Sequence, residues 1–147
     1  MITIIRGGVH HARVMHEIET ESFAVAWSEM SIADEIMQKY CICLVAVDEV
    51  GVIHGHAYMR HIVNEGQITN LAVRRDSRNQ GIGSLLVRGL IKAAKERAML
   101  GLTLEVRKSN RAAISLYERH GFAPEGIRKN YYSQPSEDGI IMWKYFK

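Results

Sequence analysis

The feature that most constrains this chain is a glycine-containing loop between an apolar run and an amphipathic segment. The run ends at Leu71-Ala72-Val73, a basic loop follows, and Gly81 and Gly83 stand one residue apart at its end. Apolar residues then recur at helical spacing, which predicts a helix from about Gly81 to Met99. The unit is therefore a strand, a loop and a helix, with glycines where the helix begins.

A loop of this kind is suited to binding phosphate. The first N–H groups of a helix have no partners inside the helix and lie at the positive end of its dipole. Glycines let an anion approach these donors closely, and Arg74, Arg75 and Arg78 add positive charge. An ordinary surface loop before a helix can carry the same pair of glycines, so the loop alone leaves both interpretations open.

Two well-known phosphate loops do not fit this sequence. The P-loop has lysine and then serine or threonine after its last glycine, whereas Ser84 follows Gly83 here. The dinucleotide fingerprint has a third glycine where this chain has Leu86, with an acidic residue about twenty positions later. The remaining pattern, Arg78-x-x-Gly81-x-Gly83 after a strand, resembles the acetyl-coenzyme A pyrophosphate loop of the Gcn5-related N-acetyltransferase (GNAT) superfamily.

The composition fits one globular domain spanning 1–147, because 147 residues with 47% hydrophobic and 24% charged side chains can form a sizeable core. The net charge of +3 is mild, so we expect no direct nucleic-acid partner, and this charge is also compatible with action on an RNA-rich assembly. No apolar run reaches the ~18 residues of a membrane span, and we expect no membrane partner. Cys41 and Cys43 lie on one face of a strand, which predicts no disulfide and a reducing cytoplasm.

Local patterns predict the element order β-α-α-β-β-β-α-β-α-β-β. The strands are expected at 2–5, 41–47, 52–62, 67–73, 102–106, 122–129 and 140–145, and the helices at 10–22, 29–39, 81–99 and 111–120. Ser28 and Asn110 are the expected N-caps, and Gly101 and Gly121 the helix stops. The β-α-β crossover makes its two strands parallel neighbours. We therefore predict an α/β (α+β) fold with a mixed, mostly antiparallel sheet of about seven strands and helices on both faces.

A second motif makes the resemblance specific. It comprises Leu104-Glu105-Val106-Arg107, Ser109-Asn110, Ala112-Ala113-Ile114, Leu116-Tyr117 and Gly121-Phe122. With Tyr131-Tyr132 near the end and an early Phe23-to-Ser28 loop, it is similar to the GNAT subgroup that acetylates ribosomal-protein alanines (RimI-like) and to archaeal N-terminal acetyltransferases. The resemblance covers nearly the whole chain. Ala26 and Arg75 depart from it, since the subgroup often has proline at both positions.

The resemblance implies a GNAT fold whose fourth and fifth strands splay apart to admit acetyl-CoA as the co-substrate. The backbone of Leu71 and Val73 would pair with the pantetheine arm, and the Val73 N–H would polarise the thioester carbonyl. Asn110 would contact the same arm, cap its own helix, or do both. The full set of implied acetyl-CoA contacts is Leu71, Ala72, Val73, Arg78, Asn79, Gln80, Gly81, Ile82, Gly83, Ser84, Asn110 and Tyr117.

Two residues are candidates for the chemistry. An α-amino group has a pKa of ~7.7–8.0, so a carboxylate acting directly or through a water can deprotonate it. Glu105 is the candidate base; the alternative is a surface carboxylate paired with Arg107 or a lysine. Tyr117 is the candidate general acid for the leaving thiolate, or it only orients the sulfur. The alternative for Tyr117 is a tyrosine packed in the core.

The peptide entrance is expected to be walled by Phe23, Trp27, Tyr131 and Tyr132, and Glu19 is expected to receive a positive group of the peptide. Ordinary hydrophobic packing is the alternative for the four aromatic residues. No histidine stands at a zinc-site spacing with cysteine or carboxylate, so we expect no metal.

The leading hypothesis is an acetyl-CoA-dependent enzyme that acetylates a protein N-terminus, with a ribosomal-protein alanine as the first choice. The alternatives are an acetyltransferase for a small amine or a lysine side chain, and a non-catalytic acyl-CoA-binding regulator. Having both Glu105 and Tyr117 favours an enzyme, because binding alone needs neither. A monomer or weak dimer is expected.

Overall fold

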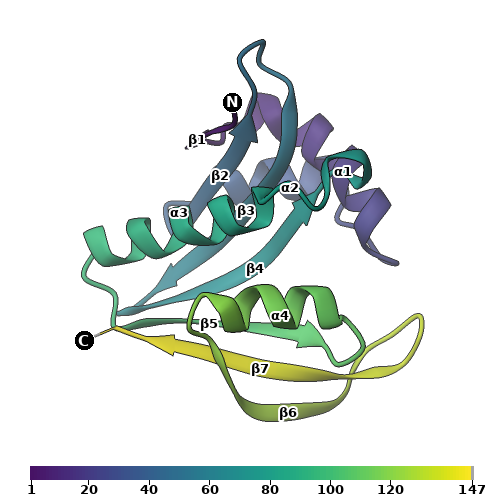
Figure 1. The fold of residues 1–147 in the computed structure, drawn as a ribbon, viewed down its shortest axis with the longest axis vertical. Helices are drawn as coiled ribbons and strands as arrows, with labels where there is room; N and C mark the ends of the chain where they lie inside the picture. Colours follow the sequence, from purple (N-terminus) through teal and green to yellow (C-terminus); the bar gives the residue numbers. More distant parts are fainter. Residues whose placement is uncertain (147) are drawn as a thin grey trace.

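The computed structural model describes residues 1–146 as a seven-stranded sheet with helices on both faces (Figure 1). The sheet order is β1-β2-β3-β4-β5-β7-β6. The elements are β1 (Thr3–Arg6), η1 (Val9–His11), α1 (Ala12–Ser22), α2 (Glu29–Ile36), β2 (Cys41–Val47), β3 (Ile53–Ile62), β4 (Glu65–Val73), η2 (Arg75–Ser77), α3 (Ile82–Glu96), β5 (Gly101–Arg107), α4 (Arg111–Arg119), β6 (Ala123–Tyr132) and β7 (Glu137–Tyr145). Within this part of the chain, no helix is long and apolar enough to cross a membrane.

The predicted fold class is confirmed. The β4–β5 pair is parallel, as the crossover through α3 requires, and the other strand pairs are antiparallel. Cys41 and Cys43 are both buried and free. Ser28 caps α2 by accepting a hydrogen bond from the Ser31 N–H (3.1 Å), and Asn110 caps α4 in the same way.

Two apolar clusters hold the helices to the sheet. On one face, α3 and α4 pack through residues such as Leu86, Leu90 and Tyr117 against β2 to β5 and β7. On the other face, α1 and α2 pack through Met15, Ile18 and Ile32 on β2, β3 and β4. The apolar periodicity of each helix explains this assignment. On the α1–α2 side, none of the described helices packs on β5, β6 or β7, and that part of the sheet stays open (Figure 1).

The splay between β4 and β5 is confirmed. The two strands pair only from Gly66 to Ile68 on β4, and beyond that point β5 continues against β7 while β4 continues against β3. On β4, Thr69 is an extra residue between the pairs that Ile68 and Asn70 make with β3. A bulge of this kind bends a strand and increases its twist. The two strands therefore start side by side and diverge toward their carboxyl ends (Figure 1).

Some predicted boundaries were wrong. Helix α3 ends at Glu96, because Ala98 takes a left-handed conformation and the Met99 N–H turns back to the Ala94 carbonyl (3.0 Å). Gly101 is not a helix stop. It begins β5 at a point where a Cβ would lie 2.6 Å from the Lys144 carbonyl oxygen.

Three further boundaries differ in the same manner. Helix α1 begins at Ala12 after a short 3-10 turn, and α2 ends at Ile36 instead of continuing to Lys39. Tyr131 and Tyr132, expected in a loop, belong to β6, because Tyr132 pairs with Glu137 across the last hairpin. Pairing with β7 extends β6 to Tyr132, and the local composition of this segment does not predict that pairing.

Candidate active site

The cleft between β4 and β5 exposes backbone groups of β4. The Arg74 N–H donates to the His54 carbonyl of β3 (2.8 Å). Because backbone groups alternate in direction along a strand, the N–H and carbonyl groups of Leu71 and Val73 point away from β3, into the cleft. These are the two residues expected to pair with the pantetheine arm.

The glycine loop forms a concave turn before α3. Asn79 and Gly81 both have left-handed backbone angles, with φ of 64° and 79°. The Leu85 N–H donates to the Gly81 carbonyl (3.1 Å), so the N–H groups of the three residues between them lack helical partners. Gly83 packs closely on α4, since a Cβ at this position would lie 3.1 Å from the Leu116 side chain. The predicted anion site is therefore a helix N-terminus reached through a left-handed turn.

The basic side chains of the loop are directed elsewhere. Arg78 donates to the Val73 carbonyl (3.3 Å) and to the Ser22 hydroxyl of α1 (3.0 Å). Arg74 donates to the Ile53 carbonyl (2.7 Å). The Ser84 hydroxyl lies 3.1 Å from His120 Nε2. At this helix start, the backbone rather than an arginine side chain supplies the free donors.

A polar relay that we did not predict supports the loop from β3. The buried hydroxyl of Ser77 in η2 lies 2.7 Å from His54 Nδ1, and His54 Nε2 donates to the Asp48 carboxylate (2.9 Å). The hydrogen bond from His54 is the largest cause that lowers the pKa of Asp48. The relay connects the β2–β3 turn to the start of the glycine loop.

Glu105 lies on the open face of the sheet. Leu104 and Val106 are buried against α3 and α4, so the side chain between them points to the opposite side. Its side chain is 15% exposed and accepts a hydrogen bond from Arg128 Nε (3.2 Å). The alternative partner, Arg107, instead binds Glu137 (3.1 Å). Glu105 follows Leu104, which is the last residue of β5 that pairs with β4, so its carboxylate lies where the cleft opens.

Tyr117 is buried in α4, with its ring centroid 5.4 Å from that of Phe122. Burial is the main cause that raises the pKa of Tyr117, and Tyr132 adds to the shift. Burial likewise raises the pKa of Tyr132 to about 12, with smaller effects from Tyr131 and Glu105. Both side chains are therefore neutral phenols at physiological pH. No residue within 1–146 hydrogen-bonds the Tyr117 hydroxyl, which leaves it free for a ligand.

The expected aromatic wall is partly assembled. Trp27 packs on Tyr58 with ring centroids 5.5 Å apart, and its carbonyl accepts a hydrogen bond from His16 Nδ1 (2.7 Å). Phe23 and Trp27 both pack against the α1–α2 cluster. On the other side of the open face, Tyr131 is half exposed and Tyr132 stacks on Arg107, with 4.6 Å between its ring centroid and Arg107 Cζ.

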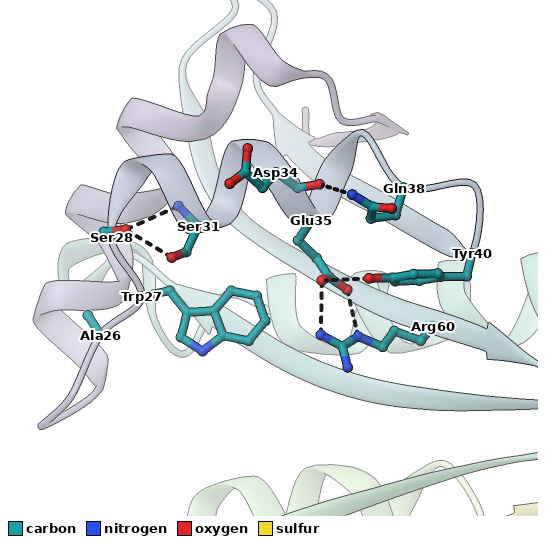
Figure 2. A pocket seen from close by; sticks show the side chains of 9 residues that line it. All are labelled: Ala26, Trp27, Ser28, Ser31, Asp34, Glu35, Gln38, Tyr40 and Arg60. Atoms are coloured by element: carbon teal, nitrogen blue, oxygen red, sulfur yellow. Dashed lines mark hydrogen bonds and ion pairs between the residues drawn. The ribbon is translucent and has the colours of Figure 1, made fainter.

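A hollow of about 500 Å³ adjoins Trp27 on the open side of α2 (Figure 2). Its polar floor is the pair between Glu35 and Arg60, joined by hydrogen bonds of 2.7 and 2.9 Å. Nothing in the sequence pattern indicated this hollow. Its lining comprises Ala26, Trp27, Ser28, Ser31, Asp34, Glu35, Gln38, Tyr40 and Arg60.

Glu19 does not lie where a peptide could reach it. Its side chain is fully buried and accepts hydrogen bonds from His56 Nε2 (2.8 Å), the Tyr58 hydroxyl and Asn70 Nδ2 (3.0 Å). We therefore withdraw Glu19 as a direct peptide contact. Glu19 follows Met15 by four residues, so the two side chains lie on the same, buried face of α1, and this spacing was a signal of burial. His56, Tyr58 and Asn70 are partners of Glu19 that we did not predict, and the alternation of His54, His56 and Tyr58 along β3 was the signal that could have indicated the two on that strand.

Residues 12–122 match the Acetyltransferase (GNAT) family, and the chain belongs to this family of N-acetyltransferases. It is 36% identical over 129 residues to the ribosomal protein bS18-alanine N-acetyltransferase of Escherichia coli (strain K12), covering 86% of each chain. It is also 36% identical over 129 residues to a protein of Bacillus subtilis (strain 168) described as a putative enzyme of the same name, covering 88% of this chain and 85% of that one.

Solved structures agree with this assignment. The crystal structure of the ribosomal-protein-S18-alanine N-acetyltransferase from Escherichia coli has a TM-score of 0.90 at 33% identity, covering 99% of this chain and 94% of that one. The structure of Ard1 from Thermoplasma volcanium has a TM-score of 0.91 at 26% identity, covering 99% of this chain and 98% of that one. The predicted resemblance to RimI-like GNAT enzymes is thus confirmed.

Proposed function

We propose that this protein transfers the acetyl group of acetyl-CoA to the N-terminal alanine of ribosomal protein bS18. The observation that carries the proposal is the position of Glu105, a carboxylate on the open face where β4 and β5 separate. The Escherichia coli relative is named as the enzyme for this substrate, and this chain has the same fold as that enzyme over nearly its whole length. An α-amino group suits such a site, because its pKa of ~7.7–8.0 requires only modest help from a base.

We place acetyl-CoA along the cleft. The diphosphate would lie at the start of α3, on the free N–H groups after Gly81, and the pantetheine arm would add to the exposed edge of β4. Asn110 already uses Oδ1 to cap α4, by accepting from the Ala113 N–H (3.1 Å), so its amide nitrogen is the group left for the arm. Arg78 would shift from the Val73 carbonyl as the arm binds.

The chemistry is a direct acyl transfer. The neutral amine attacks the thioester carbonyl carbon, the C–S bond breaks, the thiolate leaves, and the proton of the amine passes to Glu105 directly or through a water. We assign the carbonyl to the Leu71 N–H in place of Val73. Ile68 is level with Leu104, so Leu71 lies closer than Val73 to the position of Glu105 along the strands. The Val73 N–H is then free for the pantetheine amide.

Tyr117 is expected to orient the thiolate and not to protonate it fully. A buried phenol with a raised pKa is a weaker acid than a thiol, whose ordinary pKa is ~8.5. Tyr117→Phe should therefore lower kcat by only about 10-fold, less than the about 10²- to 10⁴-fold that is typical for loss of a general acid. Steady-state kinetics with purified, folded variant measures this. A loss of about 10³-fold would instead assign full proton transfer to Tyr117.

The proposed function is tested by thiol release from acetyl-CoA with a panel of amines. We expect turnover with a peptide that begins with alanine in the bS18 sequence. Slower turnover is expected with the same peptide beginning with another residue, with an N-terminally blocked lysine peptide and with a polyamine. Preference for the lysine peptide or the polyamine would favour the alternative substrates. Tight binding of acetyl-CoA without turnover of any amine would indicate a regulatory module.

A further inference from the structure

We propose that the side-chain oxygen of Asn70 binds the attacking α-amino group, as a second acceptor beside Glu105. This inference rests on the proposed function and specifies how its amine is held. Asn70 lies on β4 directly after the bulge, and its side chain points to the α1–α2 face, where it meets Glu19 of α1. Glu105 points to the same face from β5, across the cleft.

The two side chains lie at nearly the same height along the diverging strands. Ile68 and Leu104 are the last paired residues of β4 and β5, so Asn70 and Glu105 follow that pair by two residues and one residue. The backbone donor that we assigned to the thioester carbonyl, the Leu71 N–H, lies on β4 next to Asn70. An amine that attacks this carbonyl from the open face would therefore lie between the carboxylate and the Asn70 amide.

A buried network fixes which atom of the amide faces the amine. Asn70 Nδ2 donates one hydrogen to Glu19 Oε1 and the other to the Tyr58 hydroxyl, both at 3.0 Å. A carboxylate only accepts, so nitrogen must face Glu19 and oxygen must face away. Both N–H donors of the amide are thereby used within the protein. The amide oxygen has no partner among residues 1–146 and is open to solvent.

The same logic extends to the rest of the network. The Tyr58 hydroxyl donates to Glu19 Oε2, and His56 Nε2 also donates to that oxygen (2.8 Å). Glu19 and His56 are fully buried. His56 Nδ1 is a buried atom without a partner among the described residues, so Nε2 is the ring nitrogen that the network uses. The whole network presents one unused acceptor to the cleft, the Asn70 oxygen.

That acceptor matches the geometry of a primary amine. The neutral nitrogen directs its lone pair at the carbonyl carbon and has two N–H groups to place. One proton passes to Glu105, and the other stays on the amide product. As the C–N bond forms, the nitrogen gains positive charge, so a hydrogen bond from the remaining N–H to the Asn70 oxygen strengthens in the transition state. A secondary amine has a single N–H and gains nothing from Asn70.

The experiment compares an alanine-starting peptide with its N-methylalanine counterpart on wild type, Asn70→Leu and Asn70→Ala. For the alanine peptide, we expect kcat/KM to fall by about 10- to 100-fold in both variants, as for loss of one hydrogen bond to a group that gains charge. For the N-methylalanine peptide, we expect a change of less than about 3-fold, so that the preference for the primary amine is largely lost. Acetyl-CoA affinity, measured by calorimetry, should change by less than about 2-fold.

Tyr58→Phe is the matched control, because it loosens the same network while Glu19 still holds the Asn70 amide. It should slow both peptides by the same small factor. Equal losses on both peptides in the Asn70 variants, or full retention of activity, would overturn the inference. A wild-type enzyme that acetylates neither peptide would refute the proposed function itself, which is a distinguishable result.

Discussion

Glu105→Gln is expected to lower kcat by about 10²- to 10⁴-fold at neutral pH, the range for loss of a positioned general base. Glutamine keeps the shape of the side chain and a hydrogen-bond acceptor for Arg128, but it cannot take the proton of the amine. The Glu105–Arg128 pair is at the surface on the Arg128 side, so its loss should alter stability by at most about 1 kcal/mol. Steady-state kinetics, thermal unfolding and acetyl-CoA calorimetry together separate these effects.

The pH profile gives an additional readout for this variant. Above the α-amino pKa of ~8, most of the amine is already neutral for both proteins, but the attacking nitrogen must still lose a proton, so the deficit of Glu105→Gln should persist there. Glu118→Gln, an exposed glutamate on α4, is the matched control and should retain wild-type activity. If Glu105→Gln kept more than half of the wild-type rate at neutral pH, the base would have to be another group or the solvent.

The second large effect is on stability. Glu19→Ala should lower the free energy of unfolding by about 3–5 kcal/mol, because it leaves three hydrogen-bond donors without their acceptor in a buried site. Urea unfolding followed by circular dichroism measures this change. Glu17→Ala, an exposed position on the same helix whose pair with Arg13 is long (3.9 Å), should change stability by less than about 0.5 kcal/mol.

This comparison also separates the two roles considered for Glu19. A peptide contact would raise KM for the peptide and leave stability nearly intact. If Glu19 is instead a structural acceptor, its replacement lowers the free energy of unfolding, and it alters peptide binding only through Asn70. A well-folded Glu19→Ala protein with a raised peptide KM would therefore restore the role that the sequence suggested and the structure did not support.

The sequence by itself determined the parts of this protein that depend on neighbours along the chain. The loop before α3 could be recognised because helix N-termini and left-handed glycines are local features, and Gly81 has the left-handed angle that the motif requires. Ser28 and Asn110 were identifiable as caps because capping joins residues three apart. Strand alternation was sufficient to separate Glu105 from its buried neighbours.

Only the tertiary structure decided the features that depend on contacts between distant segments. The bulge at Thr69 and the splay it accompanies follow from how β4 pairs on its two sides. The burial of Glu19 depends on His56, Tyr58 and Asn70, which lie 37 to 51 residues away. Arg78 binds α1 and the Val73 carbonyl, although the sequence suggested only charge near a phosphate. Periodicity reports which face of an element is buried, whereas the partner on that face is chosen by long-range packing, which no local pattern encodes.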